Sequence, residues 1–163
     1  MTRTLSLLVA VVLSLALGSC HHIDNHRLHV GYVNLTFATQ GVWDIYGVSG
    51  AGLYKTYIRE ERIPADFPYT ALSSTGVGGI LLCTTYLGVP VAYDLACPVE
   101  CSSKVRVFIN DDNEAECPKC HSRYDVFEQL GRPIYGRAAE EGWGMQVYRV
   151  GPGPQNEYMM VSL

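Results

Sequence analysis

Short runs of β-branched and aromatic residues, separated by turn residues, recur along the chain from residue 29 onward. Residues 29–37 alternate partly between apolar and polar side chains, and no stretch of comparable length carries the apolar stripe of an amphipathic helix. Residues 78–86 and 89–94 are two further runs, joined by Leu87 and Gly88 in the manner of a hairpin. This pattern predicts a mainly β chain.

The second half of the chain continues the same pattern. Residues 104–109 and 114–116 are predicted strands on either side of an Asn-Asp turn, and residues 124–127 are a strand before a turn at 129–132. Residues 145–150 and 158–161 are predicted terminal strands around a Gly-Pro-Gly-Pro turn. With 163 residues, no internal repeat and no long linker, we expect one folded domain from residue 30 to residue 163.

The N-terminal 19 residues have the pattern of a signal peptide. A single charge at Arg3 precedes an apolar run that is too short to span a bilayer comfortably, and Gly18 and Ser19 stand before Cys20. Residues 17–20 resemble the lipobox of bacterial lipoproteins, which implies cleavage before Cys20 and acylation of that cysteine. We therefore expect a lipid-anchored protein of a bacterial cell envelope, facing an extracytoplasmic compartment, with residues 20–29 as a tether.

The charge of the chain excludes one class of partner. The formal net charge is -4 and no run of lysine or arginine occurs, so the chain has no electrostatic footprint for a nucleic-acid backbone.

His121 is the only histidine outside the predicted tether, and no Ser-His-Asp or Cys-His arrangement can be assembled around it. An electron carrier or a binding module is a better expectation than a catalyst.

Four cysteines form two closely spaced pairs. Cys97 and Cys101 are separated by three residues, Cys117 and Cys120 by two, and fifteen residues lie between the pairs. Two thiolates at such spacing can curl around one metal ion, whereas a disulfide across so short a loop is strained. The sequence therefore predicts one metal site, presented by two turns of a subdomain at about residues 95–138.

Other interpretations of these cysteines remain open at this point. In an oxidising compartment, a framework that pairs Cys97 with Cys117 and Cys101 with Cys120 is possible. Four thiolates also suit a single zinc ion or a rubredoxin-like iron. Glu100 is a reserve oxygen ligand if Cys101 points away, although a solvated loop carboxylate is its simpler interpretation.

Residues 117–125, CPKCHSRYD, resemble the second cluster-binding loop of Rieske proteins, C-P-C-H-G-S-x-Y-D. Residues 131–138 resemble that family's G-x-x-x-x-G-P-A, with Arg137 in place of the proline. The resemblance covers about residues 78–150 and is specific only in the second loop. It implies a small antiparallel β-sandwich or barrel with two metal-binding loops that hold a [2Fe-2S] cluster.

The ligand set differs from that of the family. Cys120 stands where the second histidine ligand of a Rieske protein belongs, and Cys101 stands near the place of the first. The resemblance then implies one iron on Cys97 and Cys117, and the other on Cys101 and Cys120. It also implies that the hydroxyls of two further residues hydrogen-bond the cluster, namely Ser122 and Tyr124.

Four thiolates carry more negative charge than two thiolates and two imidazoles, so the expected reduction potential is low. The sequence thus predicts a lipid-anchored, Rieske-like electron-transfer protein that meets an unidentified redox or envelope protein. The alternative is a non-redox binding module of the same fold, braced by zinc or by disulfides.

Overall fold

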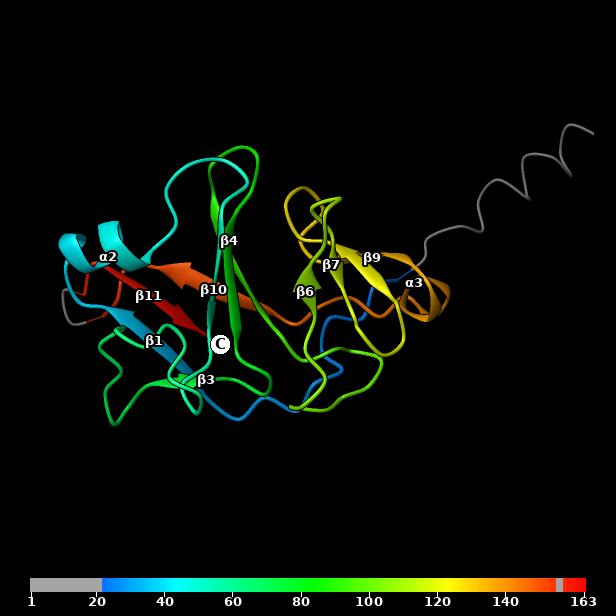
Figure 1. Cartoon of the computed structure of the whole chain (residues 1–163), viewed down its shortest axis with the longest axis horizontal. Helices are drawn as coiled ribbons and strands as arrows, with labels where there is room; N and C mark the ends of the chain where they lie inside the picture. Colours follow the sequence, from blue (N-terminus) through cyan, green and yellow to red (C-terminus); the bar gives the residue numbers. More distant parts are fainter. Residues whose placement is uncertain (1–21, 155–156) are drawn as a thin grey trace, which may run out of the picture.

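The computed structural model describes residues 22–154 and 157–163. Two antiparallel sheets dominate it, a nearly closed, barrel-like sheet of seven strands and a small sheet of four, which lie side by side in Figure 1. The prediction of a mainly β chain with antiparallel sheets is therefore confirmed.

The large sheet gathers strands from both ends of the chain. Its order is β2-β4-β5-β10-β11-β1-β3, so the central strands join the middle of the sequence to its C-terminal part. The strands are β1 (Val33–Phe37), β2 (Tyr54–Tyr57), β3 (Ser74–Thr75), β4 (Ile80–Thr84), β5 (Pro90–Asp94), β10 (Val147–Gly151) and β11 (Met159–Ser162).

The small sheet follows β5 and is consecutive in sequence, in the order β6-β7-β8-β9. A short helix follows its last strand and lies at its outer end in Figure 1. The elements are β6 (Phe108–Ile109), β7 (Ala115–Glu116), β8 (Arg123–Asp125), β9 (Arg132–Tyr135) and α3 (Arg137–Glu141).

The predicted hairpin at residues 78–94 is present as β4 and β5. Ile80 pairs with Asp94 and Leu82 with Ala92, and Gly88 in the connecting turn has φ +78°. All five residues of β4 are buried because the strand separates two cores. Leu81 and Cys83 belong to the core shared with the small sheet, whereas Ile80 and Leu82 belong to the core of the large sheet. A strand covered on both faces is a continuous apolar run, as the sequence has it.

Two short helices were not expected. The helix α2 (Gln40–Tyr46) begins at Thr39, whose hydroxyl accepts the Val42 N–H, and it buries a single residue, Trp43. A helix of only two turns that buries one side chain shows no periodic spacing of apolar residues, so the sequence pattern does not reveal it. Neither described helix is long and apolar enough to cross a membrane. The predicted signal peptide and Cys20 lie outside the described residues.

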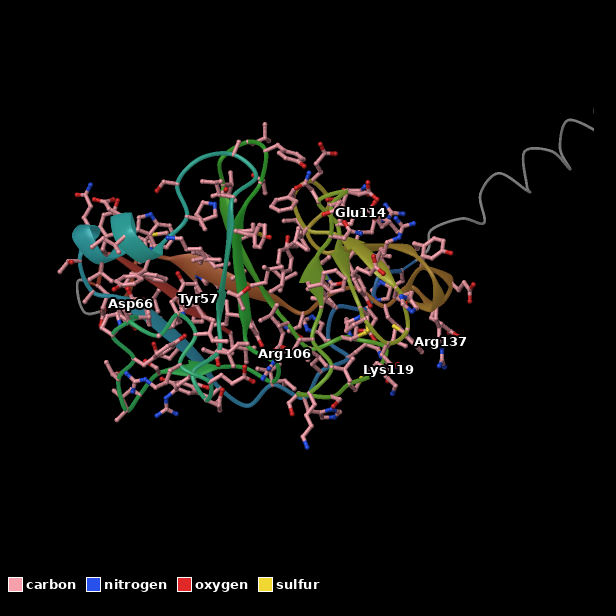
Figure 2. The ribbon with its side chains drawn as sticks, in the orientation of Figure 1. Tyr57, Asp66, Arg106, Glu114, Lys119 and Arg137 are labelled. Carbon is pink, nitrogen blue, oxygen red and sulfur yellow. The ribbon has the colours of Figure 1, made fainter. Side chains whose placement is uncertain are left out.

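The two sheets are joined at a seam near the start of β4. Arg106, which lies between the two halves in Figure 2, donates a hydrogen bond to the carbonyl of Gly78 and forms an ion pair with Glu61. Ala96 pairs with Arg106 as an isolated bridge just before Cys97. The first cysteine turn therefore starts at a point where both sheets hold the backbone.

Candidate metal centre

Each cysteine pair lies on a turn that leaves a strand of the fold. The first turn, residues 97–101, follows β5, and the second, residues 117–121, joins β7 to β8. The N–H of Cys101 donates to the carbonyl of Cys97 at 2.9 Å, and the N–H of His121 donates to that of Cys117 at 3.0 Å. The two turns therefore close in the same way.

Three of the four predicted ligands converge. The sulfurs of Cys97, Cys117 and Cys120 all lie within 4.8 Å of one another, and those of Cys97 and Cys120 are 3.6 Å apart. Cys97 and Cys117 are fully buried and Cys120 is partly buried. Thiolates at this spacing can hold a metal ion. Every cysteine in the described part of the chain is free of disulfide bonds.

Cys101 lies outside this group. Its side chain is exposed, and its thiol donates to the carbonyl of Pro98 at 3.1 Å. The guanidinium of Arg27 lies 3.9 Å from the same sulfur. The structure therefore brings together three of the four predicted cysteines and leaves the fourth at the rim of the site.

Ser122 and Tyr124 both contact the sulfur cluster. The thiol of Cys120 donates to the Oγ of Ser122 at 3.4 Å, and the same oxygen accepts the N–H of Ala138. When Cys120 is ionised, the hydroxyl hydrogen of Ser122 can donate to the thiolate instead. The hydroxyl of Tyr124 lies 3.8 Å from the sulfur of Cys97. Burial and the neighbouring Cys97 raise the pKa of Tyr124, so the tyrosine stays protonated and can donate to a thiolate.

The environments of the thiols set them apart from one another. Burial raises the pKa of Cys97 to about 12, although the backbone N–H groups of Glu100 and Val99 oppose the rise. Burial also acts on Cys120, but hydrogen bonds from Ser122 and the other two thiols outweigh it and lower the pKa of Cys120. Burial alone raises the pKa of Cys83 to about 12. The lowered pKa of Cys120 means that this thiol ionises more readily than Cys97 or Cys83.

These differences predict an alkylation pattern. In the metal-free protein, iodoacetamide should modify Cys101, which is exposed, and Cys120, whose thiolate is accessible, well before Cys97 and Cys83. Metal should protect Cys120 and leave Cys101 as reactive as before. Peptide mass spectrometry after timed labelling measures both effects, and equal protection of Cys101 would place that thiol on the metal.

The carboxylate of Glu100 crosses from the first turn to the second, where it forms an ion pair with the ammonium of Lys119. The side chain of Glu100 is only 16% exposed and that of Lys119 is 65% exposed. Figure 2 shows Lys119 on the small-sheet half, at the same end as Arg137. A charged pair thus bridges the two turns that carry the three sulfurs.

The described part of the predicted tether, residues 22–29, packs against the same region. The backbone of Asp24 exchanges hydrogen bonds with Gly142 and Gly144, and the Nε of Arg27 donates to the carbonyl of Pro98 at 3.2 Å. The guanidinium of Arg27 stacks 3.8 Å from the ring centre of Trp143. The N-terminal segment therefore braces the first cysteine turn against the end of α3.

Sequence reasoning missed Arg27 and the pairing of Glu100 with Lys119. Arg27 and Pro98 are 71 positions apart, and no local pattern connects them. The Lys119 pairing had a weak signal, because an acidic residue inside one cysteine turn and a basic residue inside the other are complementary charges on two loops expected to meet.

Comparison with known proteins does not assign the chain to a family or a function. No protein-family model, no curated protein and no solved structure gives a significant match to the chain.

Proposed function

We propose that this chain is a metalloprotein whose three converging thiolates, Cys97, Cys117 and Cys120, bind one soft divalent metal ion and so lock two turns at the end of a Rieske-like β-domain. The proposal rests on the distances between the three sulfurs, which all lie within 4.8 Å of one another. The function of the domain is then that of a metal-braced binding module at the cell envelope.

The separation favours one ion over two irons. Two sulfurs on a tetrahedral zinc ion lie about 3.8 Å apart, given a zinc–sulfur bond of about 2.3 Å. The sulfurs of Cys97 and Cys120 are 3.6 Å apart, which fits a shared ion. Ligands on different irons of a two-iron cluster are held farther apart, because both irons lie between them.

Zinc suits this donor set best among the divalent ions. Thiolates are soft ligands that select zinc and other thiophilic metals over magnesium or calcium. Zinc has no redox chemistry of its own, so its contribution is the geometry and the added stability of the two turns. The donors from Ser122 and Tyr124 spread the negative charge that three thiolates bring to one ion.

Electron transfer through a [2Fe-2S] cluster is the second candidate, and the contacts of Ser122 and Tyr124 favour it. Both hydroxyls lie at sulfurs, as the Rieske resemblance implies, and such hydrogen bonds tune the potential of a cluster. A four-cysteine cluster also requires the sulfur of Cys101, which faces Pro98 in the structure. This candidate therefore needs a rearranged first turn.

Anaerobic purification followed by metal and sulfide analysis tests the proposal. We expect about one zinc per chain, no acid-labile sulfide and no visible absorption band. Iron and sulfide in equal amounts, with a visible charge-transfer band, would replace the proposal by the second candidate. Metal-free protein with its thiols paired in disulfides would remove both.

We also propose that Cys20 anchors the protein to a membrane facing an extracytoplasmic compartment, on the strength of residues 17–20. Two or more acyl chains give stable anchoring. Cys20→Ser should therefore move the protein from the membrane fraction to the soluble fraction and abolish the mass added by acylation. Unchanged fractionation with an unmodified N-terminus in the parent protein would contradict the anchor.

A further inference from the structure

The two cysteine turns share one backbone conformation. Each begins with Cys-Pro, and the carbonyl of its first residue accepts the N–H of its fifth. The fifth residue has a left-handed backbone in both turns, with φ +48° at Cys101 and φ +55° at His121. The N–H of the first residue also donates to a carbonyl beyond each turn, to Val105 in one and to Ser122 in the other.

This correspondence can be followed position by position. Cys97 matches Cys117 at the first position, and both sulfurs belong to the cluster. Cys101 matches His121 at the fifth position, and both side chains are exposed. Cys120, the second ligand of its turn, occupies the fourth position.

The residue that matches Cys120 in the first turn is therefore Glu100, not Cys101. The extra residue between Cys97 and Cys101 moves the second cysteine from the inward fourth position to the outward fifth. The backbone accompanies this outcome, because the fifth residue of each turn combines a left-handed conformation with an exposed side chain. Both turns show this behaviour.

We infer that Glu100 is the fourth ligand, so that the site holds one metal ion with three thiolates and one carboxylate. This inference rests on the proposed single-ion site. Glu100 has the burial of a residue directed inward, since only 16% of its side chain is exposed. Its carboxylate also reaches across the opening between the turns, where it meets Lys119.

Lys119 gives the carboxylate a second partner. Neither oxygen of Glu100 belongs to the group of atoms within 4.8 Å of one another, so the carboxylate turns about its side-chain bonds to reach the ion. One oxygen then binds the metal and the other keeps the ammonium of Lys119. Three thiolates, one carboxylate and a divalent ion carry a net charge of about -2, and the ammonium offsets part of it.

Cobalt titration of purified, metal-stripped full-length protein and of three variants tests this assignment. We expect Glu100→Gln to weaken cobalt binding about tenfold or more, as loss of one ligand should, while the sulfur-to-cobalt absorption of three thiolates persists. Cys101→Ser, the matched control on the neighbouring residue, should leave both the affinity and the spectrum unchanged. Glu100→Cys should strengthen binding and raise the charge-transfer absorption to that of four thiolates.

The outcomes separate this inference from the proposed function. Loss of one thiolate band in Cys101→Ser, together with unchanged binding in Glu100→Gln, would overturn Glu100 and assign Cys101. Equal affinity in the parent protein, in Glu100→Gln and in Cys101→Ser would also overturn it, because neither residue would then bind the ion. Failure of the parent protein to bind cobalt or zinc at all would instead refute the single-ion site. Far-ultraviolet circular dichroism of each variant confirms that the fold is retained.

Discussion

Replacing Cys117 by serine should abolish tight metal binding and remove the stabilisation that metal gives to the parent protein. Cys117 is completely buried at the start of the second turn, and its sulfur lies within 4.8 Å of both other sulfurs. A metal present at about a thousand times its dissociation constant stabilises a folded protein by about 4 kcal/mol. For a chain of this size that corresponds to a rise in Tm of roughly 8–16 °C.

The measurement is the difference in Tm between zinc-loaded and zinc-free samples of each variant. This comparison within one variant cancels the intrinsic cost of a buried hydroxyl in Cys117→Ser. The matched control is Cys101→Ser, which changes the same atom at an exposed position and should keep the full rise. A zinc-induced rise in Cys117→Ser equal to that of the parent protein would contradict the three-thiolate site.

The hairpin and the second turn could be predicted because their signals are local. The β4–β5 hairpin combines two apolar runs with a Leu-Gly turn, and the structure pairs them in register. The second turn carries Cys117, Cys120, Ser122 and Tyr124 within eight residues, and all four side chains meet at the sulfur cluster. Such short-range patterns can be predicted from sequence, because residues close together along the backbone also lie close together in the fold.

The first turn could not be predicted to the same depth. Spacing shows that Cys97 and Cys101 are close in sequence, but it does not show which of two neighbouring residues points inward. The left-handed backbone at Cys101 decides this, and such a conformation is rarely signalled by a residue other than glycine or asparagine. Repetition of the Cys-Pro start in both turns was the available signal, because it aligns Glu100 with Cys120.

The N-terminal segment shows a different limit. Residues 20–29 were expected to be a tether because they directly follow a predicted lipid anchor. In the structure Leu28 is buried, Asp24 pairs with the chain beside Trp143, and Arg27 contacts the first turn. Contacts across more than 70 residues depend on the whole fold, so composition alone does not predict them.

Asp94 is the second position at which a single substitution should have a large effect. This carboxylate is completely buried and accepts hydrogen bonds from the backbone N–H groups of Val77, Gly78 and Ala96 at 2.7–2.8 Å, and from the hydroxyl of Tyr148. Burial raises the pKa of Asp94, whereas these four donors oppose the rise because they favour the charged form. One side chain thus holds the loop before β4 against the backbone that leads to Cys97.

Asp94→Ala should lower the free energy of unfolding by about 4 kcal/mol or more, because each buried N–H left without an acceptor costs about 1–3 kcal/mol. Asp94→Asn should cost less, about 2 kcal/mol, since its amide oxygen can still accept two of the four donors. Urea unfolding followed by tryptophan fluorescence measures both, and Asp111→Asn on an exposed turn is the matched control, with an expected change within about 0.5 kcal/mol.

Substitution of Asp94 should also affect metal binding, because Ala96 immediately precedes Cys97 and pairs with Arg106 across the seam. Weakening the hydrogen bond between Asp94 and the Ala96 N–H lets the sulfur of Cys97 occupy a wider range of positions. The metal affinity of folded Asp94→Asn should therefore fall several-fold, while that of Asp111→Asn stays constant. Wild-type affinity in Asp94→Asn, at the reduced stability expected for it, would show that the sulfurs are positioned by the turns themselves and not by the Asp94 hydrogen bonds.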